Sequence, residues 1–378
     1  AGVIQNGDVL IVDDRIVMVG ESVAAPRGAR IVEARGRYVT PGGFAALSAV
    51  GLSEISGSGA PDDATVEGDL VAAAADAARA FNPEVTAVAV TRMDGVTRAA
   101  IAPASTATLF GGRGALVVLD GSEDSVFRQQ AFMVVELGET GAARTGSSRA
   151  ASWPAFEAAL RDAREYPGRY RSGQGGAVLN ELDAGALAPF ARGQGLLLVH
   201  VESAADIRRV IRFKRANSNL RIAILGAAEG WEVADELAAA RIPVIVDPFA
   251  NLPASFELLS ARHDNAARLN AAGVTVAIAS GLGDAHQSRL ILQLAGNAVA
   301  NGMPWADAFA AVTLAPAEIY GVNNVGRLER NYVADVVIWD GDPLEVQSAP
   351  TTVFIEGEEQ PLVSRQTRLR DRYHPTTR

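Results

Sequence analysis

Cysteine is absent from this 378-residue sequence, which excludes disulfides, thiolate nucleophiles, cysteine-ligated zinc and iron–sulfur clusters. Lysine occurs once, as Lys214, and the net charge is −10. This acidic balance argues against a nucleic-acid-binding surface, which is normally basic. No apolar run reaches the ~18–20 residues that a membrane-spanning helix needs. With 48% hydrophobic and 21% charged residues, the composition is that of a soluble globular protein.

The two ends of the chain have the same β-rich texture. GDVLIVDDRIVMVG, near the start, has two apolar runs around Asp13-Asp14, which is a hairpin signal. ADVVIWDGDP and TTVFIEGEE, near the end, are short apolar runs closed by Gly, Asp and Pro. We therefore expect a small β-sandwich domain built from residues 1–40 and 321–360, followed by a tail at 361–378.

The middle of the chain, residues 41–320, alternates apolar strand-like runs with helical stretches. The strand-like runs include TRAAIAPAS, GALVVLDG, GLLLVHVES, LRIAILGAAEG, IPVIVDP and VTVAIASG. They are apolar on both faces, which is typical of buried parallel strands. This alternation predicts an α/β fold, a (β/α)8 TIM-like barrel. A doubly wound open sheet is the alternative, but no dinucleotide-binding fingerprint follows the first strand.

A helical insertion is expected on the barrel at about residues 145–180. SWPAFEAALRDAREY places Phe156, Leu160 and Ala163 at i, i+4 and i+7, which is an amphipathic helical pattern. Loop-like segments rich in Gly, Ser and Thr flank it on both sides.

The sequence resembles the amidohydrolase superfamily, in its imidazolonepropionase-like and dipeptidase-like branch. The resemblance rests on the opening GDVLIVDDRIVMVG…VTPGGFAAL and on the close TLAPAEIYGVNNVGRLERNYVADVVIWDGDP. It runs from Gly7 to about Gly357. It implies a barrel whose strands carry one or two divalent metals at their carboxyl ends, with hydrolysis of C–N bonds by a metal-activated water.

The same resemblance shows that most of the expected metal ligands are missing. The family's paired histidines fall on Leu47 and Ala49, and the aspartate before them falls on Ala45. A later histidine falls near Gly226, and the last-strand aspartate falls on Gly281. None of these side chains carries a lone pair. His200, in LLLVHVES, is the one expected strand-borne ligand that is retained.

A relocated mononuclear site is the sharper possibility. Asp284 and His286, in SGLGDAHQSR, follow the last strand, and Glu202 lies two residues after His200 on the same side of its strand. With His200 they supply two histidines and two carboxylates for one divalent metal, Zn, Fe or Mn. In that case His200 and Asp284 are the catalytic candidates. The structural alternatives are that His200 is a former metal ligand that now only forms hydrogen bonds, and that Asp284 caps a helix.

The remaining motifs give weaker evidence of function. Trp231 and Asn251 follow barrel strands and either line a substrate pocket or serve packing. His263 and His374 are expected on the surface. No G-x-S-x-G elbow or P-loop is present, and nothing in the sequence marks Ser48 as a nucleophile.

Two hypotheses follow. The favoured one is a non-catalytic amidohydrolase-like subunit without a cofactor, which forms a homo-oligomer or partners an active amidohydrolase relative. The other is a metal-dependent hydrolase of C–N bonds in small amides or dipeptides. The branch is often exported, so we expect a periplasmic location, with the cytoplasm as the alternative. The chain starts at Ala1 and lacks a signal-peptide pattern, which is compatible with a leader having been removed.

Overall fold

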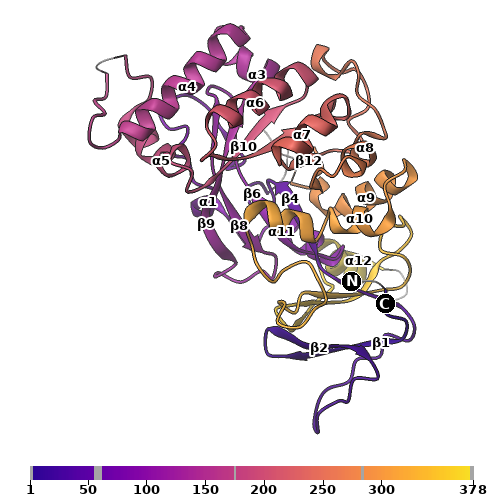
Figure 1. Ribbon diagram of the computed structural model, residues 1–378. Helices are drawn as coiled ribbons and strands as arrows, with labels where there is room; N and C mark the ends of the chain where they lie inside the picture. Colours follow the sequence, from indigo (N-terminus) through magenta and orange to yellow (C-terminus); the bar gives the residue numbers. More distant parts are fainter. Residues whose placement is uncertain (1–2, 55–61, 174–175, 282–284, 375–378) are drawn as a thin grey trace.

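Both ends of the chain form the small β domain. In the computed structural model, which describes residues 3–54, 62–173, 176–281 and 285–374, the predicted hairpin is β1 (Gly7–Val12) paired with β2 (Arg15–Glu21). A four-stranded antiparallel sheet joins distant segments in the order β16 (Glu358–Gln360), β15 (Pro350–Ile355), β14 (Val336–Trp339) and β3 (Tyr38–Pro41). Side chains of both sheets share one apolar cluster, which makes the domain a small β-sandwich (Figure 1).

The large domain is an eight-stranded barrel sheet. Its strands are β4 (Gly43–Ser48), β6 (Val96–Ile101), β8 (Phe110–Val118), β9 (Val126–Glu136), β10 (Leu196–Val201), β11 (Arg221–Gly226), β12 (Val244–Val246) and β13 (Val276–Ile278). They follow one another around the sheet in chain order, and β13 contacts β4 to bring the ends of the sheet together. Because the order never reverses, the doubly wound alternative is wrong.

One strand departs from the expected parallel arrangement. GALVVLDG lies in β8, which pairs antiparallel with both β6 and β9, whereas β4–β6 and the β9-to-β13 neighbours are parallel. The link from Ile101 to Phe110 holds only the two-residue strand β7 (Ala104–Ser105), which pairs with β5 (Thr65–Val66). A link this short has no room for the crossover helix that a parallel neighbour requires.

Helices cover the outside of the barrel (Figure 1). Their bounds are α1 (Ala77–Ala80), α2 (Thr86–Met93), α3 (Gly138–Ala143), α4 (Arg149–Glu165), α5 (Glu181–Ala191), α6 (Ala204–Ala216), η1 (Gly230–Val233), α7 (Ala234–Ala240), η2 (Phe256–Leu258), α8 (Asn265–Ala271), η3 (Gln287–Leu290), α9 (Ile291–Ala300), α10 (Trp305–Ala310) and α11 (Leu314–Tyr320). The predicted amphipathic helix is α4, with Phe156, Leu160 and Ala163 buried. Within the described part of the chain, no helix combines the length and apolarity needed to cross a bilayer.

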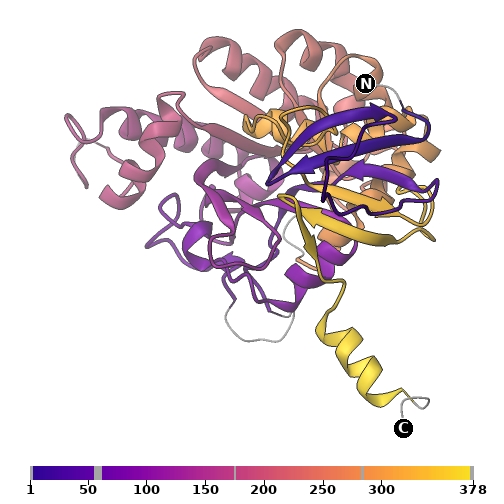
Figure 2. The same cartoon turned by 90° about the horizontal axis from the view of Figure 1, so that it is seen from below.

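The C-terminal helix α12 (Arg365–Tyr373) projects away from the body of the molecule (Figure 2). None of its residues is buried. A capping box at Ser364 satisfies the first turn through reciprocal hydrogen bonds with Thr367.

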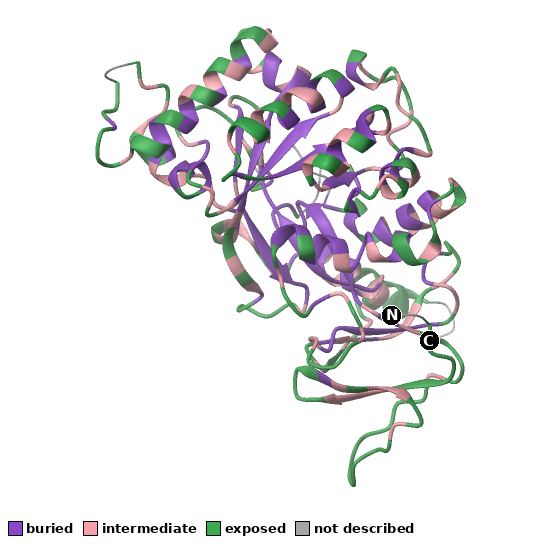
Figure 3. Ribbon diagram, viewed as in Figure 1, coloured by how far each residue is buried: buried purple, intermediate pink, exposed green. Residues whose placement is uncertain are grey.

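The barrel strands are mostly buried (Figure 3), and apolar side chains from several strands and from α11 form one cluster inside the barrel. Phe44 of β4 and Phe132 of β9 pack on Tyr320 of α11, with ring centroids 6.3 and 4.9 Å from the tyrosine ring. The Tyr320 hydroxyl donates to the Ala46 carbonyl at 2.5 Å. This helix therefore fills the amino end of the barrel and leaves the carboxyl end for a site, as in barrels of this kind.

A buried ion pair joins the barrel to the β-sandwich. Arg98 of β6 donates to Asp335 at 2.6 Å and to Glu356 at 2.8 Å. The side chains of Arg98 and Asp335 are only 3% and 5% exposed. Asp335 belongs to the C-terminal signature ADVVIWDGDP, so this part of the signature has a structural role.

Candidate functional site

His200 lies at the carboxyl end of β10 between two glutamates. Its Nδ1 is 2.6 Å from Oε2 of Glu136, and its Nε2 is 3.1 Å from Oε1 of Glu202. Glu136 ends β9 at the same register, because His200 and Glu136 are directly paired across the two parallel strands. All three side chains are largely withdrawn from solvent. Both ring nitrogens of His200 are therefore engaged with carboxylates.

The charges of this cluster stabilise one another. Burial by itself lowers the pKa of His200, but attraction to Glu136 and hydrogen bonds to Glu136 and Glu202 outweigh it and raise the pKa to about 10. Burial raises the pKa of Glu136, yet His200 and Arg144 reverse this and lower it. Near neutral pH His200 is thus held as an imidazolium beside Glu136, and in this form it cannot act as a general base.

Glu202 occupies the space in which the next expected ligand would stand. Its Oε2 accepts a hydrogen bond from the Ala228 N–H at 2.8 Å. A Cβ built on Gly226 would lie 2.5 Å from Oε1 of Glu202, and Gly226 has a φ of +91°. The position at the end of β11 therefore lacks a ligand and also lacks room for one.

The end of β4 is likewise filled by structural contacts. Leu47 joins the apolar cluster inside the barrel, and Ala49 joins the cluster between the strands and the outer helices. Between them, the Ser48 hydroxyl lies 2.5 Å from the Ser288 hydroxyl and accepts from the Val50 N–H. Ser48 thus ties the end of β4 to η3.

A second ionic cluster lies over the carboxyl ends of the strands. Glu257 of η2 accepts from the Glu139 N–H at the start of α3 and from Arg149 at 2.8 Å. Arg149 also donates to Asp206 of α6 at 2.9 Å. Because these residues come from the segments that follow β9, β10 and β12, the cluster links three loops at the barrel mouth.

Trp231 and Asn251, the predicted substrate-binding residues, make contacts within their own surroundings. The Trp231 indole N–H donates to the Ser260 carbonyl at 2.8 Å, and its ring lies under Arg262, whose guanidinium is 5.0 Å from the ring centroid. The Asn251 amide lies 2.7 Å from Nδ1 of His263 on the exposed surface. Their role in binding a substrate remains a prediction.

The other two relocated candidates, Asp284 and His286, follow β13. Asp284 lies outside the described residues. His286 precedes η3 and lines a cavity of about 530 Å³. That cavity lies between α2, η3 and the start of α12, and its lining includes Glu54, Asp94, Arg289 and Arg365. His263 and His374 are exposed, as predicted.

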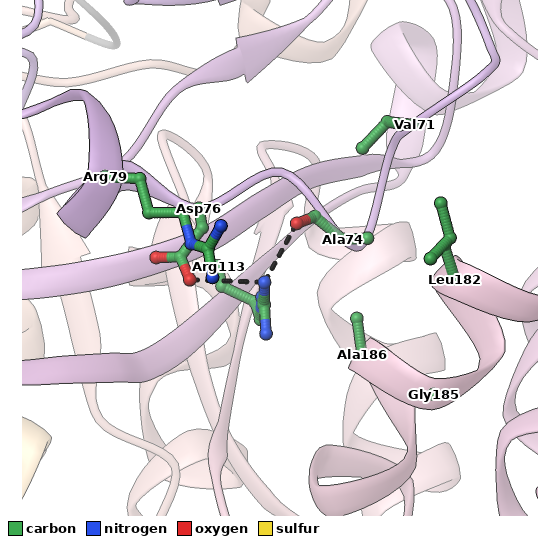
Figure 4. A pocket seen from close by; sticks show the side chains of 8 residues that line it. All are labelled: Val71, Ala74, Asp76, Arg79, Arg113, Leu182, Gly185 and Ala186. Atoms are coloured by element: carbon green, nitrogen blue, oxygen red, sulfur yellow. Dashed lines mark hydrogen bonds and ion pairs between the residues drawn. The ribbon is translucent and has the colours of Figure 1, made fainter.

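A second cavity, of about 510 Å³, lies between the segment around α1, strand β8 and α5 (Figure 4). Arg113 of β8 crosses it and is held by Asp76 at 3.2 Å and by the Ala74 carbonyl at 2.9 Å. These bonds fasten the segment before α1 to the barrel wall. Neither this cavity nor the one at His286 is lined by His200.

The sequence and the fold were compared with those of known proteins. Residues 198–362 match the family model described as the amidohydrolase family. The whole fold is similar to that of an amidohydrolase from Thermotoga maritima MSB8, with a TM-score of 0.81 and 24% identity over 93% of this chain and 94% of that one. The chain thus shares its fold with a solved amidohydrolase, and residues 198–362 match the amidohydrolase family model.

Two further similar proteins match this chain less closely or over a shorter length. The structure of N-isopropylammelide isopropylaminohydrolase from Burkholderia multivorans ATCC 17616 gives a TM-score of 0.52 at 17% identity, covering 93% of this chain and 94% of that one. Amidohydrolase tasK of Hapsidospora irregularis is 43% identical over 60 residues. That match spans 16% of this chain and 6% of the relative.

The described residues at the barrel mouth do not fit the divalent metal that the resemblance implies. Leu47, Ala49, Gly226 and Gly281 stand at the strand ends without a donor atom, and the nitrogens of His200 face carboxylates. Across the described residues, no three or more His, Cys, Asp or Glu side chains are grouped so as to hold a metal ion. Catalytic zinc sites usually have three protein ligands.

Glu136 is the site residue that sequence reasoning missed, because β9 itself was not recognised. VFRQQAFMVVE begins with exposed polar residues, and only its second half is continuously buried. The signal that could have found it is the apolar run AFMVVEL, with a glutamate at the last strand position before Gly138. In an α/β barrel that position faces the functional end.

Proposed function

We propose that this protein is an amidohydrolase-family chain that serves as a non-catalytic subunit. It keeps the barrel and β-sandwich of its superfamily and acts through association, either with a second copy or with an active amidohydrolase relative. One observation carries the proposal, namely that the strand-end ligands are replaced while the one retained histidine is neutralised by two glutamates. A protein that loses its catalytic activity but keeps its fold is expected to lose the metal-binding side chains and to retain the residues of the core.

The alternative is a hydrolase of C–N bonds in small amides or dipeptides, with one divalent metal on His200 together with Glu202, Asp284 or His286. In the described structure, Glu202 is already bonded to His200 and to the Ala228 N–H, and His286 lines a separate cavity. We therefore place this function second.

Metal content and turnover decide between the two. Mass spectrometry on protein purified without chelator or a histidine tag should find well under one equivalent of zinc, iron or manganese. The same protein should show no hydrolysis of a panel of dipeptides and N-acyl amino acids. About one equivalent of metal that is lost in His200→Ala, together with turnover lost in that variant, would overturn the proposal. A variant far from the cluster, Glu236→Ala, is the matched control.

We also propose a periplasmic location, supported only by the branch of the superfamily that the sequence resembles. Fractionation of cells expressing the native gene tests it, and recovery with the cytoplasmic markers would contradict it.

A further inference from the structure

The loop that follows β12 has its polar and apolar side chains on the unexpected sides. In residues 248–260, here called the apolar loop, Phe249, Leu252, Phe256 and Leu259 are 55%, 72%, 83% and 64% exposed. Glu257, the loop's only charged residue, is 5% exposed. Folding normally buries large apolar side chains and leaves carboxylates in water. An inverted loop of this kind indicates a surface that another molecule covers.

The apolar loop is held in this inverted state by contacts in its middle and at its C-terminal end. Glu257 is fastened by Arg149 and by the Glu139 N–H, as described above. Ser260 donates its N–H to Glu229 at 3.1 Å and accepts from the Trp231 indole at 2.8 Å. The exposed side chains are therefore displayed on a fixed support. They cannot turn inward without breaking a buried carboxylate's hydrogen bonds.

We propose that the apolar loop is the contact surface for a second copy of this chain, which docks mouth to mouth across a two-fold axis. This inference deepens the proposed function, on which it rests, by naming the surface and the partner of the non-catalytic subunit. The loop follows β12, so it lies at the carboxyl end of the barrel strands. A dimer formed here covers the face through which a barrel enzyme takes its substrate.

The exposed apolar area suits such a dimer. Four large side chains exposed to this degree present roughly 500 Å² of apolar surface per chain. That is at the upper end of what one apolar patch on a monomer exposes. Two copies together supply roughly 1,000 Å², which forms the core of a standard interface of about 1,600 Å² once a polar rim is added.

Charge favours a second copy over a charged partner. The whole chain carries −10, so two copies repel each other across most approaches. The apolar loop avoids this repulsion because its single carboxylate points inward and is neutralised by Arg149. A two-fold axis then sets the same uncharged side chains against one another, which is the self-complementary arrangement that such dimers require.

The test is sedimentation velocity on the full chain over a range of micromolar concentrations. We expect a monomer–dimer equilibrium, and in Phe256→Glu/Leu259→Glu we expect the dimer Kd to rise at least ~100-fold, because two central apolar contacts are replaced by buried charges. Met18→Glu is the matched control. Met18 is a comparably exposed apolar residue on β2, beyond the amino end of the barrel, and its substitution should leave the equilibrium unchanged (Figure 1).

Three outcomes would overturn the inference. The first is a wild-type chain that stays monomeric at the highest concentration. The second is a double variant that dimerises as well as wild type while its circular dichroism and melting temperature are unchanged. The third is a monomer that binds zwitterionic lipid vesicles through Phe256 and Leu259, which would assign the loop to a lipid surface.

Metal content and amide hydrolysis are measured on the same preparations. A chain that dimerises through the loop but hydrolyses amides would remove the proposed function and keep the interface. A chain that is inert but monomeric would do the opposite.

Discussion

Nδ1 of His200 lies 2.6 Å from Oε2 of Glu136, on the adjacent parallel strand and at the same register. The pair is buried at the end of the barrel where the superfamily performs its chemistry. A buried pair of this kind contributes little net stability relative to apolar residues of the same size. Removal of one partner is nevertheless costly, because the other buried charge loses its nearest counter-charge.

Stability should therefore depend on pH through both members of the pair. The raised pKa of His200 contributes stability that is fully present below its unfolded value of about 6.5 and is lost as the pH rises through about 10. The lowered pKa of Glu136 contributes stability that is present above its ordinary value of 4.5 and is lost as the pH falls through the folded value. Urea unfolding from pH 3 to pH 11 checks both limbs. In His200→Gln the decline between about pH 7 and pH 10 should flatten, and an unchanged decline would contradict this account.

Glu136→Ala should lower the free energy of unfolding by about 3–5 kcal/mol, because it leaves the His200 charge buried with Glu202 as its remaining close carboxylate. Glu136→Gln should cost less, since an amide oxygen can still accept from Nδ1. Chemical denaturation measures both. The control is Glu236→Ala, which breaks an exposed pair with Arg208 and should cost less than about 1 kcal/mol. Equal losses in the two alanine variants would argue against the buried pair.

Putting the superfamily's histidine back at the end of β11 should fail to create a metal site. Gly226→His places a Cβ at 2.5 Å from Oε1 of Glu202 and forces a residue with a side chain into a φ of +91°. We expect a lower melting temperature and no gain in zinc affinity by calorimetry. The double variant Gly226→His/Glu202→Ala removes the clash with Glu202 but keeps the unfavourable φ. It therefore shows how much of the lower melting temperature comes from each. Zinc bound at one equivalent in the single variant would show that the site had merely lost its ligand.

The joint between the domains depends on Asp335. Its carboxylate accepts from Arg98 at 2.6 Å and from the Glu356 N–H at 3.0 Å. Asp335→Ala should destabilise the chain by about 3–5 kcal/mol, because the buried Arg98 loses its buried counter-charge and keeps only the partly exposed Glu356. Thermal unfolding followed by circular dichroism measures the loss. Glu359→Ala, which removes a surface pair with Arg30, should be nearly neutral.

Arg149 should control how firmly the apolar loop is held. Arg149→Ala removes the ion pair to Glu257 and leaves that carboxylate with the Glu139 N–H as its remaining partner. Limited chymotrypsin digestion should then cut after Phe249 or Phe256 several-fold faster than in wild type, because local opening becomes less costly. Arg161→Ala, on the exposed side of α4, is the control. An unchanged cleavage rate in Arg149→Ala would mean that the other contacts of the loop are sufficient to hold it.

Much of the fold could be predicted from local patterns. The Asp13-Asp14 turn, the apolar runs of β10 to β13 and the spacing of Phe156, Leu160 and Ala163 each report a backbone geometry that depends on near neighbours. Strand β9 and the direction of β8 could not be predicted. The first is half exposed, and the second is decided by which neighbours it meets.

The sequence by itself determined that the superfamily's ligands are absent at Leu47, Ala49 and Gly226, because that is a matter of which atoms each side chain carries. Only the tertiary structure decided what replaced them. It set Glu136 against His200, which lies 64 residues later in the chain, and it turned Glu257 inward over the mouth. A contact between distant segments depends on the register and packing of the whole barrel, and no local pattern of residues records it.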